Sequence, residues 1–163
     1  MHLEAPSTNA VASAWYIQLP AALVGTLGFS ALFGAPRRYY FSCGVTGMLG
    51  WALYLLLLRH SALSVAGDAF FAALLVGFVS HLLAGVRHSP TTVFLICGII
   101  PLVPGGGIFW TAYHLVANHL QLAATTGFMA LKVTVAIAGG IILATALGTR
   151  WMRFSRKKHH TTV

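Results

Sequence analysis

The chain has 163 residues, of which 58% are hydrophobic and only 7% are charged, and its mean hydropathy is +0.82. Soluble domains carry about 25% charged residues, so this composition excludes an ordinary soluble protein. The net charge of +8 does not indicate a nucleic-acid-binding protein. Half of the basic residues form one cluster after an apolar run, as the cytoplasmic anchor of a membrane helix does: Arg150, Arg153, Arg156, Lys157 and Lys158.

Five apolar segments follow one another, at residues 11–33, 39–58, 63–86, 92–117 and 123–149. A helix needs about 20 apolar residues to cross the hydrocarbon core of a bilayer, and each segment reaches that length. Membrane strands would need only about ten residues of alternating polarity. We therefore predict an all-α integral membrane protein with about five transmembrane helices over residues 11–149. A short N-terminal segment, residues 1–10, precedes them, and a basic cytoplasmic tail, residues 150–163, follows.

The basic residues also predict the orientation of the chain. Five spans place the loops alternately on the two sides of the membrane. One side collects Arg37, Arg38, Arg87 and the tail cluster, whereas the other collects only Arg59. Because the more basic side is cytoplasmic, we predict that the N-terminus lies outside and the C-terminus lies in the cytoplasm.

Small residues recur at helical spacing in the second and fifth segments: Gly44, Gly47, Gly50, Gly140, Ala144 and Gly148. Small side chains at this spacing let membrane helices approach closely. We expect both faces to contact a neighbouring helix. The alternative is the ordinary tolerance of membrane helices for glycine.

The fourth segment is interrupted by Pro101, Pro104, Gly105, Gly106 and Gly107. Each proline removes a backbone donor and clashes with the preceding turn, and each glycine costs about 1 kcal/mol of helix propensity. In lipid, the freed backbone groups must be satisfied by protein or water. We predict two half-helices that meet near the midplane, with the glycines opening the second. The alternative is a simple proline kink with packing glycines.

Discontinuous helices of this kind form substrate sites in transporters. The N–H groups of Gly105, Gly106 and Gly107 would favour a carboxylate, and free carbonyls near Pro101 would suit an ammonium group or a cation. Above the break, Thr111 is in a position to reach a ligand. The predicted site for a small carboxylate substrate therefore consists of Pro101, Pro104, Gly105, Gly106, Gly107 and Thr111.

Three ionisable residues inside the apolar segments are candidates for coupling. Asp68 and Lys132 lie at similar depths on the outer side and could form a pair, because intramembrane charges are costly and usually functional. Asp68 facing the headgroups and Lys132 snorkelling outward are the alternatives. His114 could carry protons, since the ordinary pKa of histidine is about 6.5.

No motif indicates an enzyme, a metal or a cofactor. P-loop, GxSxG and HExxH motifs are absent. His114 and His119 are five residues apart and so do not share a helical face, which argues against a zinc site. Cys43 and Cys97 form no CxxC pair and lie in apolar runs, so we expect them to behave as small buried hydrophobic residues.

Several stretches together resemble the threonine/serine exporter family over about residues 20–150. They are Leu75-Val76-Gly77, Pro90-Thr91-Thr92-Val93-Phe94, Ile100-Pro101-Leu102-Val103-Pro104-Gly105 and, more loosely, Gly28-Phe29, Leu32-Phe33 and Pro36-Arg37-Arg38 with Cys43 and Gly47. The closest resemblance is to the short membrane subunit of split exporters, equivalent to the C-terminal half of fused members. It implies a secondary exporter of a small amino acid or dicarboxylate in a bacterial inner membrane, with a larger membrane subunit as partner.

Two other functions remain open at this point. A structural or assembly subunit without its own substrate site would show altered assembly, but unaltered transport, when Pro104 or Gly105 is changed. A passive channel would show flux that does not saturate. Because five spans are few for a complete carrier, we expect a hetero- or homo-oligomer.

Overall fold

The computed structural model describes residues 15–60 and 64–159, with side chains as far as Gly148. All of its regular elements in these ranges are helices, which confirms the all-α class. The predicted N-terminal segment, residues 1–10, lies outside the described residues. In chain order the helices are α2 (Trp15–Leu32), η1 (Arg37–Tyr39), α3 (Tyr40–His60), α4 (Val65–Arg87), α5 (Thr91–Ile99), η2 (Ile100–Leu102), α6 (Gly105–Val116) and α7 (Leu120–His159).

Four stretches in the described part of the chain are long and apolar enough to cross a membrane on their own: Trp15–Leu32, Arg37–His60, Val65–Arg87 and Leu120–Gly148. A fifth candidate is the pair Thr91–Leu102 and Gly105–Val116, whose two parts meet at an angle of 51°. This arrangement confirms the prediction of about five spans with the fourth discontinuous.

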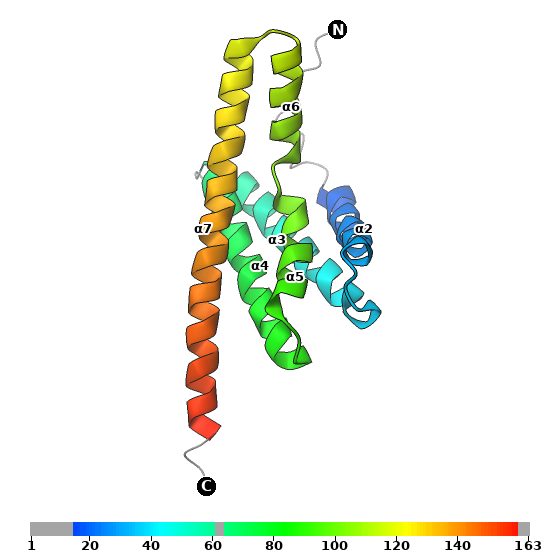
Figure 1. Ribbon diagram of the computed structural model, residues 1–163, viewed down its shortest axis with the longest axis vertical. Coiled ribbons are helices and arrows are strands. Elements are labelled where there is room, and N and C mark those ends of the chain that lie inside the picture. Colours follow the sequence, from blue (N-terminus) through cyan, green and yellow to red (C-terminus); the bar gives the residue numbers. More distant parts are fainter. Residues whose placement is uncertain (1–14, 61–63, 160–163) are drawn as a thin grey trace.

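Helices α2 to α5 form a bundle in which small residues set the distances between neighbours (Figure 1). A Cβ added to Gly47 of α3 would run into Thr26 of α2, and one added to Gly50 would run into Val76 of α4. A Cβ added to Gly98 of α5 would come within 2.8 Å of Thr46. The predicted glycine face of the second segment is therefore a true contact face.

Helix α7 packs in parallel along α4. A Cβ on Gly140 would meet Phe70, one on Gly148 would meet His81, and Ala144 lies against Gly77. These contacts ascend together along both helices, so each α7 residue in this contact region lies beside the α4 residue 67 to 70 positions earlier. The predicted small face of the fifth segment, which includes Ala144, is thus confirmed as the seam between two helices.

The bundle core consists mainly of small side chains. One buried cluster joins α4, η2 and α7, and comprises Ala69, Ala72, Ala73, Val76, Leu102 and Ile137. Since alanine allows close backbone approach, these contacts compensate for the weak hydrophobic driving force between helices in lipid.

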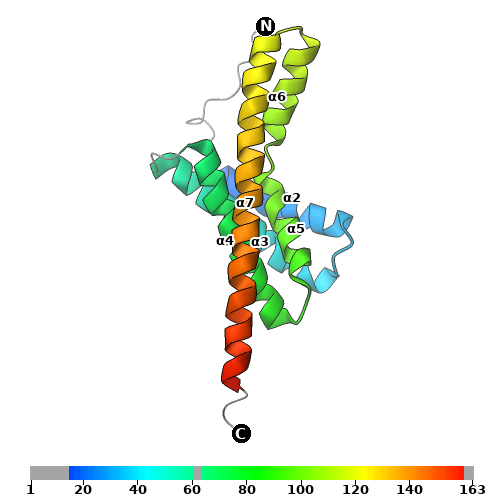
Figure 2. The ribbon, with the colours of Figure 1, turned by 60° about the vertical axis from the view of Figure 1, so that its left-hand side comes forward.

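Helix α6 and the beginning of α7 stand clear of this bundle. Both views show them as an antiparallel pair that projects beyond the other helices (Figures 1 and 2). The pair turns at Asn118, whose φ of 58° places it in the left-handed region. No residue of α6 is buried. We call residues 105–131 the outer hairpin.

Candidate functional site

The break in the fourth span is built from a tightened turn followed by a proline. Helix α5 passes into η2, where the Val103 N–H donates to the Ile100 carbonyl at 3.2 Å. Pro104 then adopts φ −75° and ψ 54°, which is not helical, and α6 begins at Gly105. The glycines therefore open the second half-helix, as predicted from the sequence.

The break lies beside the middle of α3 and α4. Leu102 is only 5% exposed, and its Cδ1 lies 3.7 Å from the position that a Cβ would take on Gly50 of α3. Val76 of α4 meets the same position. The N-terminus of α6 begins about one turn further out than Leu102, where the chain leaves the bundle.

The N-terminus of α6 is open. The Gly105 N–H donates to the Val103 carbonyl at 2.7 Å and the Ile108 N–H to the Pro104 carbonyl at 3.1 Å. No side chain caps this helix, and the described residues offer no hydrogen bond to the N–H groups of Gly106 and Gly107. No atom lies within 4 Å of the Cβ positions of Gly105 and Gly106. A carboxylate therefore has free access to two amide donors and to the positive end of a helix.

Asp68 is buried in the first turn of α4, at 1% exposure. It lies close to Tyr54 of α3, and its N–H donates to the Ser64 carbonyl at 3.0 Å. The surrounding helices therefore enclose this carboxylate, which does not lie on the exterior of the described chain. Buried intramembrane carboxylates are usually functional.

Lys132 occupies a different environment from Asp68. It is exposed on α7, and its Nζ lies 4.6 Å from the centre of the Phe128 ring. The α4–α7 register puts Asp68 level with residues 135–138 of α7, so Lys132 lies about one turn further out. Pairing between the two charges stays a prediction.

Thr111 does not face the break. Its hydroxyl donates to the Gly107 carbonyl at 2.7 Å and lies 3.2 Å from the Thr126 hydroxyl of α7. It thereby joins the two helices of the outer hairpin. The turn at Asn118 determines where α7 returns beside α6. The sequence of the fourth segment alone therefore could not predict which way the Thr111 side chain points.

His114 is half-buried on α6. Its ring stacks on Trp110 at 5.9 Å between centroids, and its Nδ1 is buried without a hydrogen-bond partner among the described residues. The chain turn brings the rings of His114 and His119 to 6.4 Å. Even so, no three potential metal ligands come together in the part of the chain that the structure describes.

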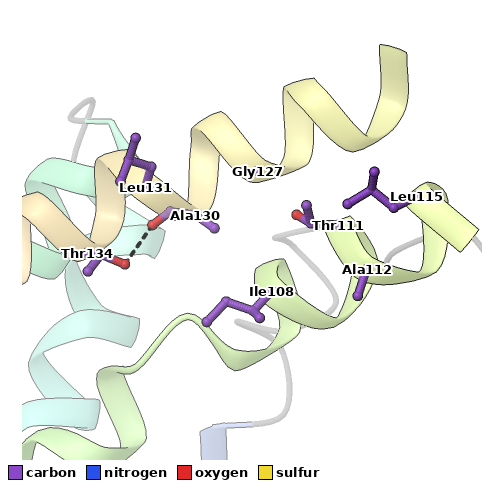
Figure 3. Close-up of a pocket in the computed structure, with 8 residues that line it drawn as sticks. All are labelled: Ile108, Thr111, Ala112, Leu115, Gly127, Ala130, Leu131 and Thr134. Atoms are coloured by element: carbon purple, nitrogen blue, oxygen red, sulfur yellow. Dashed lines mark hydrogen bonds between the residues drawn. The ribbon is translucent and has the colours of Figure 1, made fainter. Parts of the chain in front are cut away.

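An open groove of about 400 Å³ runs between α6 and α7 (Figure 3). Its walls are apolar apart from two threonine hydroxyls, one of which bonds the Ala130 carbonyl at 2.9 Å. The lining residues are Ile108, Thr111, Ala112, Leu115, Gly127, Ala130, Leu131 and Thr134. The break glycines are not among them, so this groove is separate from the open end of α6. Its lining suits an apolar side chain better than a zwitterion.

Cys43 and Cys97 form a pair that the sequence did not reveal. Both thiols are buried, at 0% and 1% exposure, in one cluster between α3 and α5. They lie within reach of each other and of the Ser30 hydroxyl. Because the residues are far apart in the chain, only the packing of α3 on α5 brings them together.

Known proteins resemble this chain over most of its length. The family described as "Threonine/Serine exporter, ThrE" matches residues 18–147. A Corynebacterium glutamicum protein named "Threonine/serine exporter" is 30% identical to the chain over 110 residues, which cover 68% of this chain and 22% of that protein. The chain thus spans about a fifth of the length of this relative. No solved structure matches the chain.

Proposed function

Because the chain belongs to the threonine/serine exporter family, we propose that it is a membrane subunit of a secondary transporter that exports a small amino acid. A threonine- or serine-like amino acid is the leading substrate, and a dicarboxylate is the second candidate. The family is one of exporters and not of enzymes, and the chain is a multi-pass membrane protein. We place it in the inner membrane of a bacterium, in keeping with its bacterial relative.

The observation that supports this proposal most directly is the open N-terminus of α6 in the interrupted fourth span. The free N–H groups of Gly106 and Gly107 suit the carboxylate of an amino acid. The buried carboxylate of Asp68 lies eight residues before Val76 in α4, toward the end of the bundle from which α6 leaves. It would provide negative charge for an ammonium group or a coupling cation. Two opposite charges of this kind are what a zwitterionic substrate requires.

The site needs a second protein surface. Gly105 and Gly106 are exposed, and nothing in the described chain lies near them. Unsatisfied N–H groups that face hydrocarbon cost several kcal/mol each, so protein or water must cover this end of α6. A larger membrane subunit of the same family is the partner that we propose, and transport then proceeds by alternating access around the shared break.

Gly105→Leu, with Gly105→Ala as its matched control, tests the site. Both side chains enter open space in this chain, so folding should be normal. Leucine would cover the amide donors, whereas alanine would leave them accessible. We expect Gly105→Leu to lower threonine or serine export from loaded proteoliposomes at least about 10-fold, which corresponds to about 1.4 kcal/mol, and to abolish stabilisation of the complex by substrate. Unchanged export would exclude a substrate site at the break.

The same experiment separates the alternatives. If this chain only assists assembly, Gly105→Leu would reduce the yield of complex but leave transport per complex unchanged. If it forms a channel, flux would rise linearly with concentration instead of saturating. Competition by serine, threonine and succinate would distinguish the amino-acid substrate from the dicarboxylate.

A further inference from the structure

The outer hairpin extends beyond the level at which the rest of the bundle ends. Along the α4–α7 register, the first residue of α4 lies beside residues 132–135 of α7. The part of α7 that begins at Leu120 therefore continues about 12 residues past α4, or about 18 Å at 1.5 Å per residue. Helix α6 accompanies it along this length (Figures 1 and 2).

Three charged residues mark the level where the outer hairpin leaves the bundle. Gly50 of α3 contacts Val76 of α4. Arg59 lies nine residues after Gly50, and Asp68 lies eight residues before Val76, so both lie toward the same end of the bundle. Lys132 lies about one turn further along α7. By contrast, residues 105–131 contain no Asp, Glu, Lys or Arg. An uncharged hairpin therefore projects past the level of these three residues.

The bilayer cannot cover this projection completely. The apolar part of α7, Leu120–Gly148, has 29 residues and is about 43 Å long. It would fit a hydrocarbon core of about 30 Å only at a tilt of about 45°, beyond the usual range of up to 40°. Its basic tail holds its other end at the cytoplasmic surface. The tip of the outer hairpin therefore leaves the hydrocarbon.

The projecting surface is strongly apolar. Phe109, Leu115, Leu120 and Phe128 are 55% to 63% exposed, and Val116 is 90% exposed. The part of this patch at the tip, outside the hydrocarbon, is unfavourable in water and indicates a protein interface. The groove on the outer hairpin adds shape, because Ala112, Gly127 and Ala130 leave room for a side chain from another helix.

We propose that the outer hairpin is a docking element, covered by the remaining part of the exporter, and that its groove receives an apolar side chain from that part. This inference rests on the proposed function only for the identity of the occupant. About four-fifths of the relative's length lies outside the matched residues, so the family contains the additional chain.

Photocrosslinking in membranes of the native host tests this proposal. The photoreactive amino acid p-benzoylphenylalanine replaces Ala112 in the groove or, as a control, the exposed Val24 of α2. The expected product from position 112 is a covalent adduct whose peptides match the part of the Corynebacterium glutamicum exporter outside the 110 aligned residues. An adduct that contains only peptides of this chain, or only lipid, would overturn the proposal.

Ala112→Phe provides a second measurement. Phenylalanine fills the groove, whereas Ala138→Phe places the same side chain at an exposed position of α7 outside the outer hairpin. We expect Ala112→Phe to reduce copurification of the crosslinked partner at least about 10-fold and Ala138→Phe to leave it unchanged. Equal copurification of both variants would contradict docking at the groove. If the adduct forms but Gly105→Leu does not affect export, the docking proposal holds and the proposed substrate site is wrong. If position 112 crosslinks only to lipid but Gly105→Leu abolishes export, the substrate site holds and the docking proposal is wrong.

Discussion

Gly140 of α7 lies against the backbone of Phe70 in α4. A Cβ at Gly140 would come within 2.6 Å of the Phe70 carbonyl oxygen, whereas one at the adjacent Gly139 would lie at an ordinary 3.6 Å from the Phe70 ring. Backbone cannot move aside as a flexible side chain can. The close contact between α4 and α7 therefore requires glycine at position 140 but not at position 139.

Gly140→Ala should destabilise the protein, because the added methyl group must push α7 away from α4. We expect a loss of about 1–3 kcal/mol, as for other overpacked cores. Gly139→Ala should be neutral or stabilise by up to about 1 kcal/mol, since alanine favours the helix. Thermal unfolding in detergent, followed by size-exclusion chromatography, measures both. Equal unfolding midpoints for the two variants would show that α7 packs less tightly against α4 than the structure indicates.

Asp68→Asn should lower export at least about 10-fold, because it removes the buried negative charge but keeps the size of the side chain. Asp68→Glu keeps the charge and should retain part of the activity. Lys132→Gln should have a smaller effect, since Lys132 is exposed and lies over Phe128. Initial export rates at matched protein levels provide the measurement. Full activity of Asp68→Asn would remove this carboxylate from the transport mechanism.

A double-mutant cycle tests the predicted pairing of these charges. If Asp68 and Lys132 interact, the combined Asp68→Asn and Lys132→Gln variant should depart from additivity by at least about 0.5 kcal/mol in unfolding free energy. Strict additivity would mean that the two residues act separately.

Oxidation should join Cys43 and Cys97. Copper phenanthroline with dioxygen removes two electrons and two protons from the paired thiols and forms one intramolecular disulfide between α3 and α5. We expect maleimide labelling of the denatured protein to disappear after oxidation and to return after reduction. Export should fall at the same time, because the first half of the broken span becomes tied to α3. Cys43→Ser should be unaffected by the oxidant, and persistent labelling of the oxidised wild type would refute contact between the thiols.

The predicted orientation can be read from cysteine accessibility in a background without Cys43 and Cys97. Ala117→Cys, at the tip of the outer hairpin, should react with a membrane-impermeant maleimide added to intact cells. Lys158→Cys, in the basic tail, should react only after permeabilisation. The reverse pattern would invert the topology and place the open end of α6 toward the cytoplasm.

Local chemistry made the spans and the break predictable from sequence. Apolar length defines a membrane helix regardless of its neighbours, and Pro104 followed by glycines ends one helix and begins another in any context. The start of α6 at Gly105 follows from these rules. Helix α7 exceeds its predicted range at both ends, from Leu120 to His159. At the C-terminal end the reason is that arginine and lysine favour helix as well as water.

Features that depend on packing between distant segments were not predictable. The direction of Thr111 depends on the path of α7, and the contact between Cys43 and Cys97 depends on how α5 crosses α3. The burial of Asp68 has the same origin, since its position in the chain fits a headgroup-facing residue equally well. A single sequence carries no record of these long-range contacts.

One uninterrupted helix, α7, connects the tip of the outer hairpin to the basic segment at the opposite end of the molecule. Its contact with α4 at Gly77 and Ala144 lies between these ends and can serve as a fulcrum. A rigid rod held there behaves as a lever: a sideways displacement at the hairpin appears with opposite sign at the cytoplasmic surface. Opening on one side of the membrane and closing on the other would then be two ends of the same motion.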